Sequence, residues 1–199
     1  MSELDSLVRR VDPDRWLASR FIADERARAD VVALYAFDYE LSRVHKVTTQ
    51  PLLGEIRLTW WAEAIAEIFE GRPVRRHPVT LALAHAIARH SLPREPLDAM
   101  IDARLPELEG QPPDALAIAT ASMTLAVRIL GAGEAKVSAA AQAWVDRAPA
   151  DLKQANRDFG NLPSAAFPAV AHATLIRAPK ASAVGKRLRL AWAVLRGRL

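Results

Sequence analysis

Apolar residues recur at helical spacing along most of the chain, with proline or polar residues between the runs. Val31, Leu34, Leu41 and Val44 follow the spacing of one helix face. No stretch alternates apolar and polar residues for long enough to indicate a strand. With Pro, Gly and short polar residues taken as boundaries, the pattern predicts helices that begin at Asp12-Pro13 and Asp24, and others over about 52–70, 78–90, 96–105, 113–131, 134–148, 150–159, 164–177 and 182–197.

This pattern predicts an all-α bundle of at least six helices. A chain of 199 residues is long enough to bury one substantial core. It contains neither an internal repeat nor a low-complexity linker that would separate two cores. We therefore expect a single helical domain over residues 1–199.

The amino-acid composition excludes several kinds of catalytic and metal-binding site. The chain has no Cys, which excludes disulfides, thiolate catalysis and Cys-based metal sites. His77, His85, His90 and His172 show none of the spacings typical of zinc sites. We expect these four histidines to be structural or surface residues.

Charge and hydropathy bear on location and on partners. The first five residues lack the apolar core of a signal peptide, and no apolar run approaches the roughly 18 residues of a spanning helix. We expect a cytoplasmic location, with peripheral attachment to the inner membrane as an open alternative. The net charge is +4, but residues 181–199 hold five basic residues and no acid, which leaves −1 for the rest. Nucleic acid is not expected as a partner, because its binding requires basic residues over a groove-sized face.

Four segments, in order, resemble successive segments of one protein family. They are Asp12-Pro13-Asp14-Arg15-Trp16-Leu17-Ala18, Leu34-Tyr35-Ala36-Phe37, Gly54-Glu55-Ile56-Arg57-Leu58-Thr59-Trp60-Trp61 and Leu97-Asp98-Ala99-Met100-Ile101-Asp102-Ala103-Arg104. In these segments, which cover roughly residues 12–130, the chain resembles the squalene/phytoene synthase family. The resemblance implies an isoprenoid-synthase-type helical bundle, here shortened.

The same resemblance implies that a metal site has been lost. In the synthases the helix after Leu-Tyr-Ala-Phe carries a D-x-x-x-D pattern, whose two acids hold magnesium against a diphosphate. Here those positions are Ser42 and Lys46, which cannot replace two carboxylates as ligands of a hard divalent ion. The second Asp-rich helix of the synthases has no full copy, and the acids Asp98 and Asp102 lack facing acids. We expect no catalytic residue, no metal and no cofactor.

The helix that begins at Asp24 presents a line of polar side chains within an apolar surface. At about 100° per residue, Tyr35, Asp38, Ser42, His45 and Lys46 lie on neighbouring lines. They form either a cavity wall, at the place where the resembled enzymes hold diphosphate, or a partly exposed helix edge. A hydrolase triad is disfavoured because three residues along one helix rarely converge on one oxygen.

Cations and aromatic residues nearby extend the ligand-binding hypothesis. Arg43 and Lys46 are either solvated or bind an anionic head group, for which the guanidinium fork of Arg43 is suited. Arg57, four residues before Trp61, either reaches a buried anion or extends along the apolar face. Of the adjacent Trp60 and Trp61, one is expected in the core and the other at its boundary. The alternative is an aromatic wall for an isoprenoid chain.

The predicted C-terminal helix is basic and amphipathic. Its apolar stripe is flanked by Lys186, Arg187, Arg189, Arg196 and Arg198. Such a helix, with Trp192 on the stripe, suits a lipid headgroup layer or a partner surface. The preferred interpretation is that the stripe docks on the core and leaves the basic face outside. The stripe consists of Val184, Leu188, Ala191, Trp192, Leu195 and Leu199.

Two hypotheses for the function follow. The first is a non-catalytic member of the family that binds an isoprenoid or lipid ligand or a protein partner. The Glu-Leu-x-x-Val pattern from Glu40 to Val44 resembles the branch without Asp motifs, which includes mitochondrial factors that assist assembly of respiratory complex I. The second is a magnesium-dependent prenyltransferase that condenses two allylic diphosphates. The carboxylate inventory favours the first. A subunit that acts only beside a catalytic homologue is a third alternative.

Overall fold

Helix α3 (Glu25–Val47) is the central element of the fold, which is described from a computed structural model. The structure describes residues 2–47, 50–133, 135–160 and 162–199. Every regular element within these residues is a helix, which confirms the predicted all-α fold. The others are α1 (Glu3–Val11), α2 (Pro13–Ser19), α4 (Pro51–Phe69), α5 (Pro78–His90), α6 (Glu95–Asp102), η1 (Leu105–Glu109), α7 (Ala115–Ile129), α8 (Ser138–Asp146), α9 (Leu152–Asp158), α10 (Pro168–Ala171), η2 (His172–Arg177) and α11 (Ala183–Arg196).

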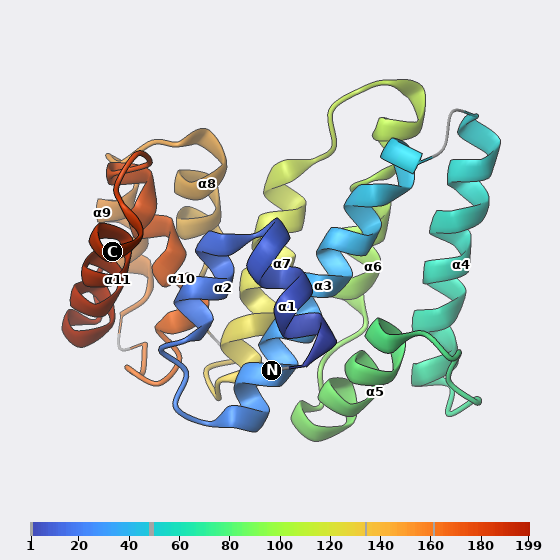
Figure 1. Ribbon diagram of the computed structural model, residues 1–199, viewed down its shortest axis with the longest axis horizontal. Coiled ribbons are helices and arrows are strands. Elements are labelled where there is room, and N and C mark those ends of the chain that lie inside the picture. The colour runs from blue at the N-terminus through green and yellow to red at the C-terminus, as the bar shows by residue number, and fades with distance from the viewer. Residues whose placement is uncertain (1, 48–49, 134, 161) are drawn as a thin grey trace.

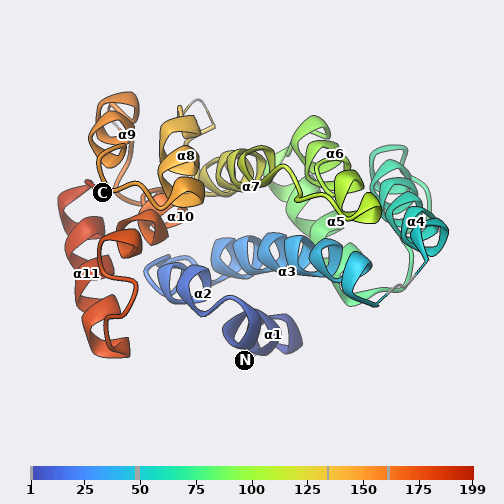
Figure 2. The same ribbon diagram turned by 90° about the horizontal axis from the view of Figure 1, so that it is seen from above.

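The layers are arranged around α3. Helices α1 and α2 cover one side of it, and α5, α6 and α7 cover the other (Figure 2). Helix α4 stands at one end of the molecule, whereas α8 to α11 form the opposite end (Figure 1). Because neighbours surround α3, every residue from Val31 to Asp38 is buried. The core therefore runs along α3 and continues into the end formed by α8 to η2, where Leu152, Phe167 and Val170 are fully buried.

Most helix starts follow from local chemistry. The Asp12 carboxylate accepts a hydrogen bond from the Arg15 backbone N–H at 3.1 Å, with Pro13 in the first turn, so α2 begins as predicted. Asp24 caps α3 in the same way through the N–H groups of Arg26 and Ala27. Prolines likewise stand in the first turns of α4 and α5.

The structure differs from the predicted boundaries at several places. Helix α1 was not predicted, because it is short and polar, yet Ser2 caps it through the Asp5 N–H. The helix predicted over 96–105 ends earlier, at Asp102, and the separate helix η1 follows from Leu105. The predicted helix 164–177 is divided into α10 and η2. The helices predicted over 113–131 and 134–148 begin later, at Ala115 and Ser138.

Helix α11 contradicts the preferred interpretation of its apolar stripe. Its buried residues are Leu190 and Ala193, and α11 packs through this side against η2 and α10. Lys186 adds an ion pair to Asp14 of α2 at 2.6 Å. The helix thus docks on the body. Of the large side chains of its stripe, Leu199 is buried, but four are exposed: Val184, Leu188, Trp192 and Leu195. No helix in the described ranges combines the length and apolar character that a bilayer crossing requires.

Candidate functional site

One face of α3 lies in a buried network of ion pairs. Asp38 is 5% exposed, and each of its carboxylate oxygens faces a separate guanidinium. Arg15 donates to Oδ2 at 2.6 Å and Arg104 donates to Oδ1 at 2.7 Å. Arg15 also pairs with Asp12, and Arg104 with Glu107 at 3.3 Å. The network therefore joins α2, α3 and η1, and it neutralises Asp38 from two sides.

Burial and charge together set the protonation of this network. Burial lowers the pKa of Arg15, but Asp12 and Asp38 outweigh that effect and raise it above its ordinary value. Burial likewise raises the pKa of Asp12, and Arg15 more than reverses the change. The Arg15 guanidinium lies over the Tyr35 ring, 4.8 Å from its centroid. Burial raises the pKa of the Tyr35 hydroxyl, which has no hydrogen-bond partner among the described residues.

His172 borders the network and stays neutral. Burial, with a further contribution from Arg15, lowers the pKa of its imidazole to about 3. Its ring packs edge-to-face on Trp144 with centroids 4.9 Å apart, and within the part of the chain that the structure describes its Nδ1 has no hydrogen-bond partner. The expectation that His172 is structural agrees with this position in the core.

The remaining residues of the predicted polar line have separate environments. The Ser42 hydroxyl donates to the backbone carbonyl of Tyr39 at 2.7 Å. His45 Nδ1 lies 3.2 Å from a carboxylate oxygen of Glu107, although without the geometry of a hydrogen bond. Lys46 is exposed. The polar line is real, but Asp38, Ser42 and His45 belong to the side of α3 that faces the network.

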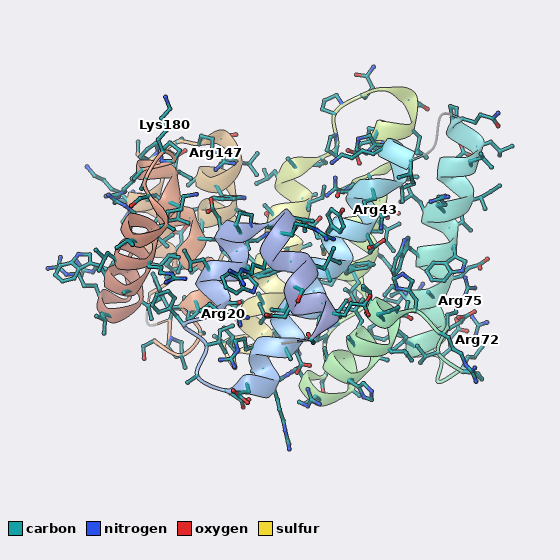
Figure 3. All side chains as sticks on the ribbon, in the orientation of Figure 1. Arg20, Arg43, Arg72, Arg75, Arg147 and Lys180 are labelled. Carbon is teal, nitrogen blue, oxygen red and sulfur yellow. The ribbon has the colours of Figure 1, made fainter. Side chains whose placement is uncertain are left out.

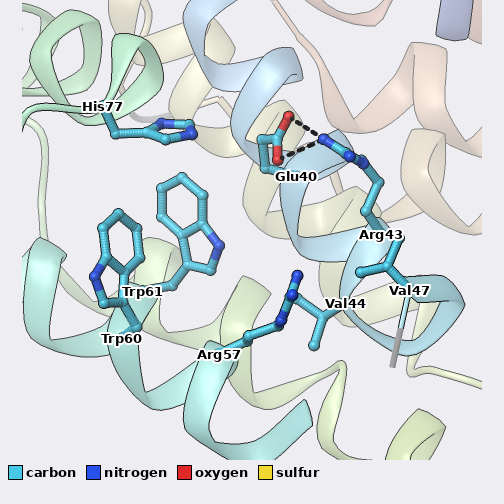
Figure 4. A pocket seen from close by; sticks show the side chains of 8 residues that line it. All are labelled: Glu40, Arg43, Val44, Val47, Arg57, Trp60, Trp61 and His77. Carbon is cyan, nitrogen blue, oxygen red and sulfur yellow. Dashed lines mark hydrogen bonds and ion pairs between the residues drawn. The ribbon is translucent and has the colours of Figure 1, made fainter. Parts of the chain in front are cut away.

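The opposite side of α3 borders a cavity of about 200 Å³, which Figure 4 shows from close by. Residues at i, i+3, i+4 and i+7 share one helix face, and this spacing describes the α3 side chains that line it. The wall is completed by α4 and by one residue just before α5. The lining residues are Glu40, Arg43, Val44, Val47, Arg57, Trp60, Trp61 and His77.

The cavity brings together Arg43, Arg57 and Trp61. They belong to the eight candidate ligand-binding residues from the sequence, which are Tyr35, Asp38, Ser42, Arg43, His45, Lys46, Arg57 and Trp61. The other five do not line it. The two groups lie on different sides of α3. Asp38 and His45 are within about 20° of each other around the helix axis, whereas the cavity residues of α3 are centred on the opposite side. The cavity is also lined by Trp60, which the sequence suggested only through the alternative of an aromatic wall, and by His77, which was expected to be structural or at the surface.

An aromatic cluster forms the inner wall. Trp61 contacts Phe37, Trp60 and His77, with ring centroids 5.5, 4.9 and 5.1 Å apart and all pairs edge-to-face. Trp61 is buried and Trp60 only partly so, which confirms that one tryptophan belongs to the core and the other to its boundary. The wall therefore rests directly on the core through Phe37.

The mouth of the cavity carries more positive than negative charge. Arg43 pairs with Glu40 at 3.1 Å, and its side chain is 45% exposed. Arg57 is exposed and forms no ion pair within the described ranges. Two guanidinium groups and one carboxylate thus stand beside an aromatic wall. Such a site can hold an anionic group at its mouth and an apolar chain inside it.

Arg75 fixes the rim of this cavity. Its guanidinium bonds Glu67 at 2.8 Å, Glu63 at 2.7 Å and the Trp60 carbonyl at 3.1 Å. It also lies over the Trp60 ring, 5.1 Å from the centroid. The hydrogen bond from Arg75 lowers the pKa of Glu67 below its ordinary value. Arg75 therefore holds the segment that carries His77 against α4, in the region where Figure 3 labels Arg72 and Arg75.

The acids of the described chain are arranged differently from a metal site. Asp98 pairs with Arg94 at 2.8 Å, and Asp102 is exposed. In the part of the chain that the structure describes, no group of three or more His, Asp or Glu side chains is placed to hold a metal ion.

The sequence did not identify Arg15 and Arg104 as partners of Asp38. Both lie within segments that resemble the family, and this was the only signal for them.

Comparisons with known proteins agree with the geometry. The sequence model of the squalene/phytoene synthase family matches residues 8–120, a range that contains both the ion-pair network and the cavity. The chain is similar to proteins named NADH dehydrogenase (ubiquinone) complex I, assembly factor 6. Identity is 30% for the Homo sapiens protein, 29% for that of Bos taurus and 31% for that of Rattus norvegicus, each over 105 residues. The match covers 53% of this chain but only 31% of the relatives' length. No solved structure matches the chain.

Proposed function

We propose that this chain, which belongs to the squalene/phytoene synthase family, acts without catalysis as an assembly factor that binds a protein partner. The relatives that support this proposal are named as assembly factors of respiratory complex I. The match spans less than a third of their length. The activity of the full-length relatives is therefore part of what is proposed for this chain.

The observation that carries the proposal is the environment of Asp38. It is the one buried acid in the second half of α3, and Arg15 and Arg104 occupy both of its oxygens. Ser42 and Lys46 stand at the positions where the resembled synthases carry their metal-binding acids. Ionisation of a diphosphate leaving group requires a metal charge that acids hold in place. The chemistry of these side chains supports binding rather than group transfer.

Deletion of the gene in its native host tests the assembly function. We expect less assembled complex I in blue-native gels, with unchanged amounts of its transcripts, and recovery when the wild-type chain is restored. The purified protein should release no diphosphate from farnesyl diphosphate. A magnesium-dependent condensation product from protein free of contaminating synthase would instead establish the prenyltransferase alternative. Complex I at its normal level in the deletion strain would overturn the assembly function.

A second candidate function is the binding of an isoprenoid or lipid with an anionic head group in the cavity. Arg43 and Arg57 at the mouth and Trp60 and Trp61 at the wall favour this ligand chemistry. Farnesyl diphosphate is the probe. We expect it to bind equally well with and without magnesium, because guanidinium groups rather than a metal would hold the diphosphate.

Paired variants test the cavity. Replacement of Arg43 and Arg57 by Gln should weaken farnesyl diphosphate binding by about tenfold or more, since each charge-assisted hydrogen bond contributes about 1.5–3 kcal/mol. The matched control replaces Arg26 and Lys153, which are exposed elsewhere, by Gln and makes the same change in net charge. Equal weakening in the two double variants would show general charge attraction and would remove the cavity as the site.

A further inference from the structure

The C-terminal helix presents its largest apolar side chains to the outside. Val184, Leu188, Trp192 and Leu195 recur at helical spacing and are 63%, 66%, 58% and 81% exposed. Helix α11 is nevertheless anchored, because Leu190 is fully buried and packs on the opposite side. The stripe is therefore a fixed surface of the fold and not the loose end of a frayed helix.

The apolar surface extends from α11 onto α2. Trp16, Leu17 and Phe21 join Val184 and Leu188 around a groove of about 560 Å³. Ala191, Arg20 and Arg187 complete its lining. A contiguous apolar patch that crosses two helices and is bordered by cations is typical of an interaction site, whereas single exposed apolar residues need no explanation.

The charged residues of the C-terminal segment all have one sign. Residues 181–199 contain five basic residues and no acid. Lys186 is paired with Asp14 at 2.6 Å, and Arg196 lies over the Trp192 ring, 4.0 Å from its centroid. Within the described ranges Arg187, Arg189, Arg196 and Arg198 form no ion pair. The surface that complements this face must therefore be anionic, which disfavours a second copy of the same positively charged face.

The position of α11 favours a flat partner. It is the outermost helix at its end of the molecule in both ribbon views (Figure 1, Figure 2). Figure 3 labels Lys180, which precedes α11, and Arg147 at the same end. A plane can therefore touch α11 along its length, which is about 21 Å for 14 residues.

We propose that α11, with the adjoining groove of α2, docks on the surface of an anionic lipid bilayer. Leu188, Trp192 and Leu195 would enter the headgroup layer, and Arg187 and Arg189 would pair with lipid phosphates. This contact lies at the end of the molecule opposite to α4, so the cavity between α3 and α4 stays accessible to its own ligand.

Flotation of the purified 199-residue protein with vesicles tests this docking. Wild-type protein should bind vesicles of phosphatidylcholine with about 30 mol% phosphatidylglycerol and should not bind vesicles of phosphatidylcholine alone. Binding should fall as salt rises from about 0.05 to 0.5 M, because the Debye length shortens over this range. Absence of binding to the anionic vesicles at low salt, or equal binding to both kinds, would overturn the proposal.

Two pairs of variants locate the contact. Replacement of Arg187, Arg189, Arg196 and Arg198 by Gln should lower the partition coefficient by about fivefold per arginine. Replacement of Arg26, Arg76, Lys136 and Lys153, which are exposed on other surfaces, removes the same charge and should lower it much less. Leu188→Ser with Leu195→Ser should weaken binding by about tenfold or more. Leu52→Ser with Ile56→Ser, two exposed residues of α4, should not.

Circular dichroism and the melting temperature separate docking from misfolding. All four variants should keep the wild-type melting temperature, because the replaced side chains are exposed. If Leu188→Ser with Leu195→Ser instead converts a dimer into a monomer and leaves vesicle binding unchanged, the stripe is an interface between copies and the lipid proposal is wrong.

Discussion

The two faces of helix α3 use their charges in opposite ways. Asp38 on one face is held by Arg15 and Arg104, and no side chain of the three is more than 16% exposed. On the other face Arg43 forms an ion pair with its neighbour Glu40 and remains half exposed beside the cavity. Charges that bridge distant segments hold the fold together, whereas a charge paired within one helix stays available to a ligand. Substitutions on the two faces should therefore have different consequences.

The largest expected effect is the loss of Asp38. Asp38→Ala leaves the buried guanidinium groups of Arg15 and Arg104 without their shared acid, and removal of one partner from a buried ionic group typically costs about 3–5 kcal/mol. We expect a loss of this size in the free energy of unfolding, measured by urea denaturation. A triple variant with Asp38→Leu, Arg15→Met and Arg104→Met should recover much of it. A loss below about 1 kcal/mol for Asp38→Ala would show that water enters the network.

The next largest effect is expected on acidification, which should lower the free energy of unfolding through the buried His172. His172 has a pKa of about 3 in the folded protein, whereas an unfolded histidine titrates near about 6.5. The unfolded chain binds the additional proton between these values, so the stability that His172 provides is lost as the pH falls through this window. The slope from His172 is at most about 1.4 kcal/mol per pH unit.

A pair of histidine variants isolates this slope. His172→Leu should flatten the dependence of unfolding free energy on pH between about pH 6 and 4, whereas His85→Leu, at an exposed position, should leave it unchanged. Urea denaturation across this pH range measures both. The same slope in His172→Leu as in the wild type would assign the acid sensitivity to carboxylates such as Asp12.

The smallest effect on stability is expected on the open face. Glu40→Ala removes a partly exposed pair within one helix, and such pairs contribute about 0.2–1 kcal/mol. Because the substitution also frees the Arg43 guanidinium, farnesyl diphosphate should bind more tightly. Urea denaturation and isothermal titration measure the two effects. Tighter binding with little loss of stability would show that this face, unlike Asp38, contributes to ligand binding more than to stability. Weaker binding would show that the ligand needs Glu40.

The fold could be predicted because its signals are local. Asp12-Pro13, Pro51 and Pro78 mark helix starts by their own chemistry, and the spacing of Val31, Leu34 and Leu41 identifies the central helix. The partners of Asp38 could not be predicted, since Arg15 and Arg104 lie 23 and 66 residues away along the chain. Nothing in the spacing of one helix specifies which distant cation will meet it.

The two misjudged surfaces share a physical cause. On α3 the polar line was identified, but a polar line can face either a cavity or a buried ionic network, and Asp38 and His45 face the network. On α11 the amphipathic pattern was also identified, but it does not specify which side meets the body. The small Ala193 and the buried Leu190 make that contact, and Lys186 reinforces it through Asp14.

Arg75 has a consequence for how quickly the cavity can fill. Because this side chain ties the segment before α5 to Glu63, Glu67 and Trp60, the position of His77 at the rim is set before any ligand arrives. A rim that is already ordered loses little conformational entropy on binding. Ligand association should therefore be a single kinetic phase whose rate rises linearly with ligand concentration. Arg75→Gln should add a slower phase that becomes independent of concentration as the rim closes around the ligand.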